Sequence, residues 1–182
     1  MRCLFSILMV CVGLNLPAQN ENKIEYRTFT STDFNFTILC PTTWEENKDI
    51  NEIVPFIFEA PRDNENDFFR ENVNAVVEIS RGYLLSQYVD ALVGKLQSRL
   101  ANFKLHARGI AEDNPLRPAW IIYDNAKGDL PLKFLSYFYK VGGNVIIVTG
   151  SAKIEEFDRY QPIFDTVCNS YKILPPPIET KK

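Results

Sequence analysis

Residues 132–152, LKFLSYFYKVGGNVIIVTGSA, decide the fold because they contain two consecutive segments that are apolar on both sides. Segments 132–141 and 144–152 each carry apolar side chains at both odd and even positions, as strands do when both faces of a sheet are covered. Gly142-Gly143 between them is typical of a tight hairpin. This stretch therefore predicts two neighbouring strands at the centre of a sheet that has cover on both faces.

Alternating apolar and polar residues before this hairpin predict further strands. The first two, 25–30 and 34–40, are expected to form a hairpin around Thr32-Asp33, and Pro41 is expected to end the second. The others are 54–59, which Pro61 closes, and 73–79, 104–110 and 119–125.

Two segments with apolar residues at spacings of three and four predict the helices that cover the sheet. The first extends from Ser86, a candidate N-cap, to about Asn102. The second begins near Ile154, but Pro162 interrupts it. Because proline is best tolerated in a first helical turn, we expect a short helical piece over 154–159 and a main helix that begins near Pro162.

The chain divides into three parts, of which the first, 1–18, has the features of a secretory signal peptide. Arg2 precedes an apolar run, Cys3–Leu14, and Leu16-Pro17-Ala18 offers a cleavage site before Gln19. The run is shorter than the roughly 20 residues of a spanning helix, so no integral membrane span is expected after cleavage. Residues 19–174 are expected to form one α+β domain, followed by a flexible tail over 175–182.

Composition and charge narrow the class of protein. The chain is 46% hydrophobic and 24% charged, as globular domains are, with a formal net charge of −3. Nucleic-acid binding depends mainly on basic residues, so we expect no nucleic-acid partner. With a signal peptide and a bacterial source, the predicted location is secreted or periplasmic.

Two of the four cysteines, Cys3 and Cys11, lie in the predicted signal peptide. Lipidation of Cys11 is an alternative to simple cleavage, although Leu8-Met9-Val10 lacks the small residues expected before a lipidated cysteine. In an oxidising compartment Cys40 and Cys168 either form a disulfide or are two separate buried thiols.

No metal, cofactor or catalytic constellation is expected. The acidic stretch Asp63–Asp67 imitates a calcium loop, but Phe68 and Asn74 stand where that loop needs glycine and glutamate. A solvated connector is the simpler interpretation of this stretch. His106 is the only histidine and has no visible catalytic partner, so a structural or surface position is expected.

Phe68, Phe69 and Arg70 are the candidate partner-binding residues. Two adjacent aromatic residues in an extended segment cannot both point inward, so one is expected to project outward as an anchor. The alternative is that the loop folds back and buries both. For Trp44 and Trp120, core packing is the expectation.

The order of these elements resembles the PsbP-like family, whose superfamily also contains a Ran-GTPase-binding protein and bacterial secreted lipoproteins. The resemblance covers roughly residues 26–174. It rests on three groups of residues: Phe34-Asn35-Phe36-Thr37-Ile38 with Pro41 and Trp44; Phe58-Glu59-Ala60-Pro61 followed after a polar loop by Asn72-Val73-Asn74-Ala75-Val76; and Glu156-Phe157, Tyr160, Pro162, Phe164 and Ser170-Tyr171-Lys172-Ile173.

The resemblance implies an antiparallel sheet sandwiched between helical layers, and a binding or assembly factor rather than an enzyme. Nothing in the chain aligns with the manganese-cluster or calcium-retention role of photosynthetic members. We therefore predict a secreted, non-catalytic binding or assembly module of the cell envelope whose partner is another protein. The alternatives are a secreted hydrolase that uses carboxylate chemistry and a structural envelope component without a discrete ligand.

Overall fold

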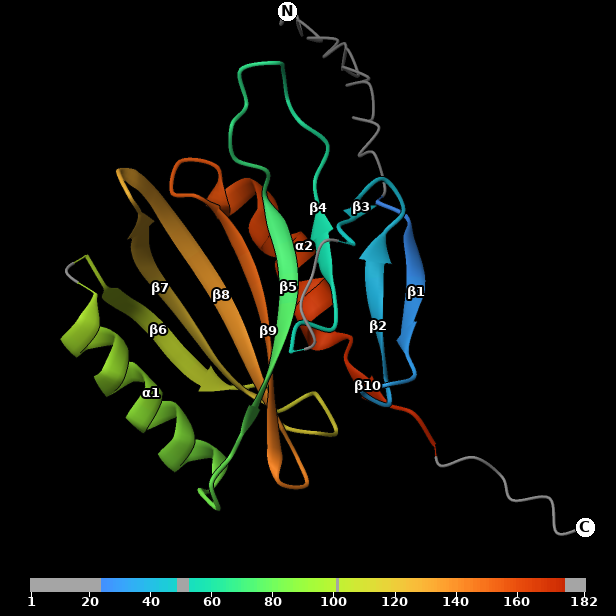
Figure 1. The fold of residues 1–182 in the computed structure, drawn as a ribbon, viewed down its shortest axis with the longest axis vertical. Coiled ribbons are helices and arrows are strands. Elements are labelled where there is room, and N and C mark those ends of the chain that lie inside the picture. Colours follow the sequence, from blue (N-terminus) through green and yellow to red (C-terminus); the bar gives the residue numbers. More distant parts are fainter. Residues whose placement is uncertain (1–23, 49–52, 101, 176–182) are drawn as a thin grey trace, which may run out of the picture.

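The computed structural model describes residues 24–48, 53–100 and 102–175, whose strands form two antiparallel sheets (Figure 1). The predicted signal peptide, with Cys11, lies outside the described residues, as does the predicted tail apart from its first residue.

The larger sheet has seven strands in the order β3-β4-β5-β9-β8-β7-β6. The hairpin predicted at Gly142-Gly143 is confirmed, because β8 and β9 pair from Leu132↔Lys153 to Val141↔Asn144 and lie in the middle of the sheet. The strands are β3 (Glu45–Glu46), β4 (Ile57–Glu59), β5 (Asn72–Ile79), β6 (Lys104–Ile110), β7 (Ala119–Lys127), β8 (Leu130–Val141) and β9 (Asn144–Lys153).

The smaller sheet has three strands in the order β1-β2-β10. The predicted hairpin is present: β1 (Tyr26–Ser31) pairs with β2 (Phe36–Pro41), although β2 begins at Phe36 rather than Phe34. The short β10 (Lys172–Ile173) adds to the other edge of β2 and brings the end of the described chain back to its beginning.

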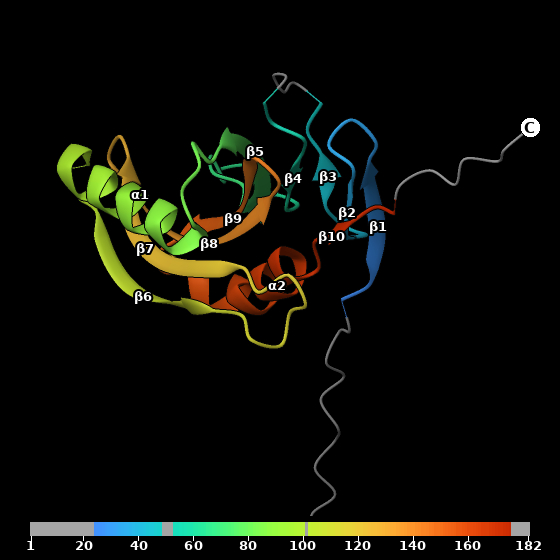
Figure 2. The ribbon, with the colours of Figure 1, turned by 90° about the horizontal axis from the view of Figure 1, so that it is seen from below.

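The two helices cover opposite faces of the larger sheet (Figure 2), which confirms the predicted sandwich. Helix α1 (Leu85–Arg99) buries Tyr88, Val89 and Val93 on β7 and β8. Ser86 is not its N-cap: the helix begins at Leu85, and the Leu84 backbone N–H donates to Gln87 Oε1 at 3.0 Å. In the described part of the chain, neither helix has the length and apolar character that a membrane crossing requires.

Helix α2 (Phe157–Asn169) is continuous, so the break predicted at Pro162 is wrong. Proline supplies no N–H to the carbonyl of Asp158. Both residues are exposed, so water can satisfy that carbonyl. On the other side of the helix, Phe157 and Phe164 are fully buried, and this burial holds the turn on both sides of the proline in place.

The main core lies between α2, the large sheet and β2. Gly150 in β9 lets α2 approach closely, because a Cβ at this position would lie 2.4 Å from Phe164 Cγ. Trp44 is buried here, as predicted, and contacts Tyr160 and Phe164 edge-on.

Cys40 and Cys168 are both free and buried, so of the two alternatives the separate buried thiols are present. Burial raises the pKa of the Cys40 thiol to about 11 and also raises that of Cys168. Both thiols are therefore protonated at neutral pH and unreactive.

Candidate functional site

The segment 61–71, here called the Phe68 loop, joins β4 to β5 and contains the three predicted partner-binding residues. The three residues differ in their exposure to solvent. Phe68 is 91% exposed, whereas Phe69 and Arg70 are half-buried. The structure therefore has one outward-facing aromatic side chain in this loop.

Arg70 is committed to contacts inside the protein. Its guanidinium contacts the carboxylates of Glu45 at 2.9 Å and Glu59 at 3.2 Å, and its Nε donates to the Ala60 carbonyl at 2.6 Å. This side chain ties the end of the Phe68 loop to β3 and β4, which gives it a positioning role.

Residues 63–66 of the acidic stretch are exposed, as expected of a solvated connector. Asp67 is the exception, because it is only 5% exposed. Its Oδ1 lies 2.7 Å from Lys153 Nζ at the end of β9, and its Oδ2 accepts from the Asp63 backbone N–H at 3.3 Å. The hydrogen bond from Lys153 holds the pKa of Asp67 below its usual value, and Asp67 raises the pKa of Lys153. The pair fixes the base of the loop to the central sheet.

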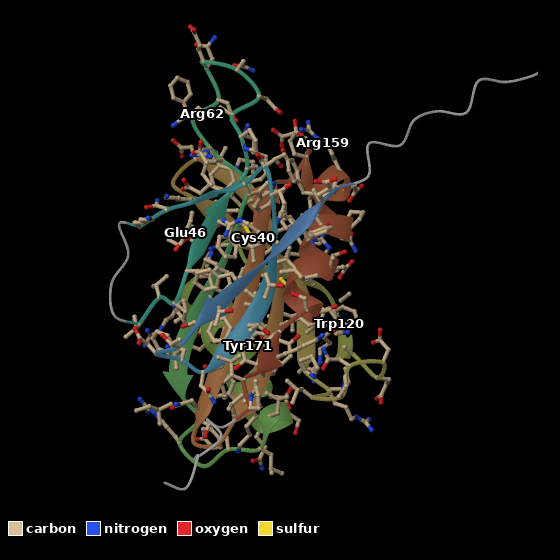
Figure 3. All side chains as sticks on the ribbon, turned by 90° about the vertical axis from the view of Figure 1, so that its right-hand side faces the viewer. Cys40, Glu46, Arg62, Trp120, Arg159 and Tyr171 are labelled. Carbon is tan, nitrogen blue, oxygen red and sulfur yellow. The ribbon has the colours of Figure 1, made fainter. Side chains whose placement is uncertain are left out.

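The arginines on either side reinforce this arrangement. Arg62 donates to the Asp67 carbonyl oxygen, and Arg159 of α2 contacts Asp63 Oδ1 at 3.1 Å. Figure 3 shows Arg62 and Arg159 at the same end of the molecule. Phe68 is therefore presented on a loop that is held by hydrogen bonds to several elements.

Glu71, the last residue of the Phe68 loop, is 2% exposed. Within the described residues its Oε1 has no hydrogen-bond partner, and burial raises the pKa of its carboxyl group. A buried carboxylate without full pairing costs stability, so Glu71 is a destabilising element beside the Asp67–Lys153 pair.

His106 lies in β6 at the irregularity in the pairing with β7, and its Nε2 is 2.6 Å from Asp124 Oδ2. Both side chains are partly exposed. His106 therefore lies at a partly exposed position in the sheet, beside Asp124. In the part of the chain that the structure describes, no group of three or more His, Cys, Asp or Glu side chains could hold a metal ion.

A second concave site, the Trp120 cleft, lies between α2 and the β6–β7–β8 side of the sheet, with a volume of about 570 Å³. Trp120 is half-buried: it packs against the main core, as predicted, and also lines this cleft, with its ring close to Gly109 of the neighbouring strand. The full lining is Ile110, Ala111, Glu112, Asp113, Trp120, Ile122, Leu135, Tyr137, Gln161, Asp165 and Asn169.

Asp165 is the carboxylate of most chemical interest in this cleft. Burial raises its pKa, against the hydrogen bond that it accepts from the Tyr137 hydroxyl at 3.3 Å. Among the other acidic groups, Glu112 pairs with Arg117 at 2.5 Å, and Asp113 is exposed. Sequence patterns missed this cleft because its residues come from separate elements that only the fold brings together.

The antiparallel sheet, with one helix on each face, places this protein in the α+β class. No protein-family model matches the sequence, and no curated protein matches it by sequence.

Solved structures identify the fold within that class as PsbP-like. Cyanobacterial PsbP (CyanoP) from Synechocystis superimposes with a TM-score of 0.59 and 16% identity over 91% of this chain and 98% of that one. LpqN of Mycobacterium tuberculosis, involved in cell envelope biogenesis, superimposes with a TM-score of 0.59 and 13% identity over 85% of this chain and 93% of that one. The Ran-binding protein Mog1p of Saccharomyces cerevisiae superimposes with a TM-score of 0.59 and 7% identity over 83% of this chain and 96% of that one.

Proposed function

We propose that this chain is an exported, non-catalytic binding or assembly module of the cell envelope, and that it contacts another protein through the Phe68 loop. One observation carries the proposal: Phe68 is 91% exposed on a loop whose base is fixed by Asp67–Lys153 and Arg70–Glu59 contacts. A large aromatic side chain held out of the core is the kind of residue that anchors protein interfaces.

The fold neighbours support the same class of function. Mog1p is a Ran-binding protein, so this fold can present a protein-binding surface, and LpqN acts in cell envelope biogenesis. The predicted signal peptide over 1–18 supports export to such a location.

The test is capture of the partner from a cell-envelope extract by wild-type protein and by Phe68→Ala. Leu116→Ala is the matched control, because Leu116 is a large apolar residue, 39% exposed, in the loop between β6 and β7. We expect Phe68→Ala to weaken capture by about 1 kcal/mol or more while thermal stability stays within about 0.5 kcal/mol. Equal capture by all three proteins would contradict the proposal.

The raised pKa of Asp165 favours the alternative of a hydrolase with carboxylate chemistry in the Trp120 cleft. Such chemistry needs a second carboxyl group about 5–10 Å away, facing the same bond. The residues that line the cleft in the described part of the chain include no Ser, Cys or His as a nucleophile or base. Turnover of chromogenic glycosides or esters by wild type, lost in Asp165→Asn, would establish this alternative.

A further inference from the structure

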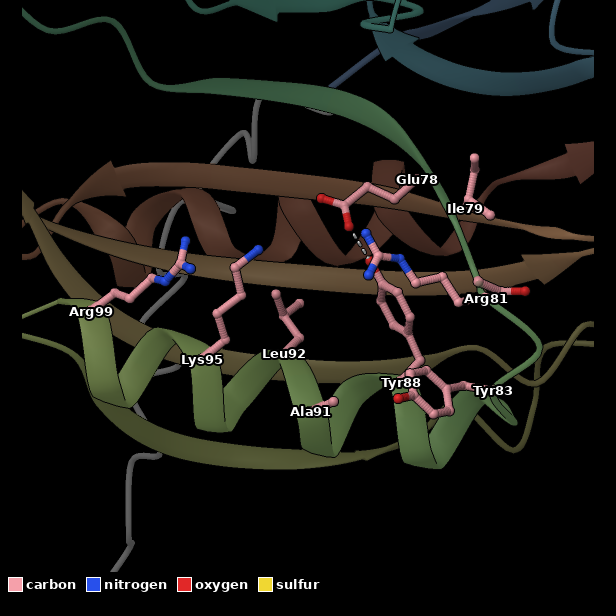
Figure 4. Close-up of a pocket in the computed structure, with 10 residues that line it drawn as sticks. Glu78, Ile79, Arg81, Tyr83, Tyr88, Ala91, Leu92, Lys95 and Arg99 are labelled. Carbon is pink, nitrogen blue, oxygen red and sulfur yellow. Dashed lines mark hydrogen bonds between the residues drawn. The ribbon is translucent and has the colours of Figure 1, made fainter.

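A groove of about 390 Å³ lies between α1 and the end of β5, away from the Phe68 loop (Figure 4). Its α1 side is formed by one stripe of the helix, which includes Tyr88, Lys95 and Arg99. Its other side includes Glu78 and Arg81 at the end of β5 and in the following turn. We call this feature the α1 groove.

The α1 groove is basic although the whole chain has a formal net charge of −3. Arg81, Lys95 and Arg99 are all exposed, and none of them forms an ion pair with a carboxylate in the described part of the chain. Elsewhere in the described residues Arg70, Arg108, Arg117 and Arg159 each contact a carboxylate, Arg27 lies over the Phe58 ring, and Arg62 donates to the Asp67 carbonyl. Arg99 lies in the last turn of α1, where its charge interacts favourably with the helix dipole, whereas Lys95 and Arg81 lie outside that turn.

Glu78, the carboxylate of the groove, is engaged by a neutral group. The Tyr88 hydroxyl donates to Glu78 Oε2 at 2.6 Å, and burial together with Glu78 raises the pKa of Tyr88 (Figure 4). This hydrogen bond connects α1 to β5 across the floor of the groove. Glu78 is the one carboxylate among the described lining residues, against the three cations Arg81, Lys95 and Arg99, so the groove has an excess of positive charge.

The turn that carries Arg81 is fixed in a conformation that arginine rarely adopts. Arg81 has φ +50° and is followed by Gly82 at φ +79°. The Ser80 N–H donates to the Gly143 carbonyl at 2.8 Å, and Lys140 donates to the Tyr83 carbonyl. Arg81 therefore projects from a rigid, strained turn rather than from a free loop.

We propose that the α1 groove binds an extended acidic segment of the protein partner, an inference that rests on the proposed function. Figure 4 shows Lys95 and Arg99 toward one end of the groove and Arg81 toward the other, so the positive charge is spread along its length. That distribution fits a chain with several carboxylates better than one compact anion. Ile79 is 72% exposed and lies at the Arg81 end of the groove, where it offers an apolar contact (Figure 4). A concave groove fits a peptide better than the surface of a membrane.

The probe is a fluorescein-labelled peptide of repeated Glu-Ser-Leu units, titrated by anisotropy with a Lys-Ser-Leu peptide as the charge control. The test variant is Lys95→Gln with Arg99→Gln. Its matched control is Lys127→Gln with Lys172→Gln, which removes the same charge from two exposed strand residues. We expect the acidic peptide to bind wild type and the control alike, about tenfold or more weaker to the test variant, and weaker as salt rises.

Three results would overturn the assignment: no binding of the acidic peptide, equal binding of the basic peptide, or equal losses in both double variants. Sedimentation with phosphatidylglycerol vesicles covers the membrane alternative, and groove-dependent binding to vesicles without binding to the peptide would also overturn it. If these results occur while Phe68→Ala still loses partner capture, the groove assignment alone fails. If capture is unaffected by Phe68→Ala yet the peptide binds the groove, the interface proposed for the Phe68 loop fails.

Discussion

Replacing Gly150 by alanine tests the packing of α2 against the sheet. A Cβ at Gly150 would lie 2.4 Å from Phe164 Cγ, 2.6 Å from its Cδ1 and 2.8 Å from its Cβ. Carbon atoms in contact are about 3.5–4.0 Å apart, so Phe164 and its helix would have to move by about 1 Å. Phe164 is fully buried, which leaves it no open space to move into.

Overpacking of this kind costs about 1–3 kcal/mol, and the size of the overlap places the expected loss near 3 kcal/mol. For a chain of this length, that loss corresponds to a fall in Tm of roughly 6–12 °C. Urea and thermal unfolding followed by circular dichroism measure it.

Gly94→Ala is the matched control, because the same substitution in α1 meets nothing within 4 Å. There alanine removes the helix penalty of glycine, and we expect a gain of up to about 1 kcal/mol. A Gly150→Ala protein as stable as wild type would refute the close approach of α2 to β9. A loss of stability in Gly94→Ala would refute the position of α1.

Three further substitutions are expected to change the free energy of unfolding. Lys153→Met leaves Asp67 buried without its cation, so we expect a loss of about 2–3 kcal/mol at pH 7 in urea unfolding. Because the pKa of Asp67 is lowered by folding, this contribution exists above its unfolded value and disappears as pH falls below about 4, where the variant and wild type should converge. Glu71→Gln should stabilise the protein by about 1 kcal/mol at pH 7. Burial raises the pKa of Glu71 in the folded protein, so its carboxylate costs stability once the pH rises above the pKa of the unfolded chain. An unchanged urea midpoint would contradict this. Gly109→Ala should displace Trp120, whose Cζ2 would lie 2.8 Å from the new Cβ, at a cost of about 1–3 kcal/mol with a shift in tryptophan emission.

The sequence predicted the centre of the fold because the deciding signals are local. Apolar residues on both faces of 132–141 and 144–152 require cover on both sides of a sheet, and β8 and β9 lie in its middle. The break predicted at Pro162 does not occur, because the packing of Phe157 and Phe164 outweighs one missing hydrogen bond near an exposed turn. The two-residue strands β3 and β10 carry no periodic signal at all.

The candidate sites could be predicted only where the residues that form them are neighbours in the sequence. Adjacent aromatic residues indicated that one would face outward, and Phe68 does. Residues 63–66 are exposed as the sequence predicted, but the burial of Asp67 depends on Lys153, which lies 86 residues further along the chain, and no local pattern indicates it. The α1 groove depends on the turn at Arg81 lining the same groove as Lys95 and Arg99 of α1, a relation that spacing along α1 alone cannot show.

The central claim, that the Phe68 loop contacts a protein partner, is tested most directly by photo-crosslinking. Benzoylphenylalanine is placed at position 68, and at position 116 as the control, and intact cells that produce the protein are irradiated. The account predicts one discrete adduct with another protein from position 68 that position 116 does not give. No adduct from position 68, or the same adducts from both positions, would contradict it.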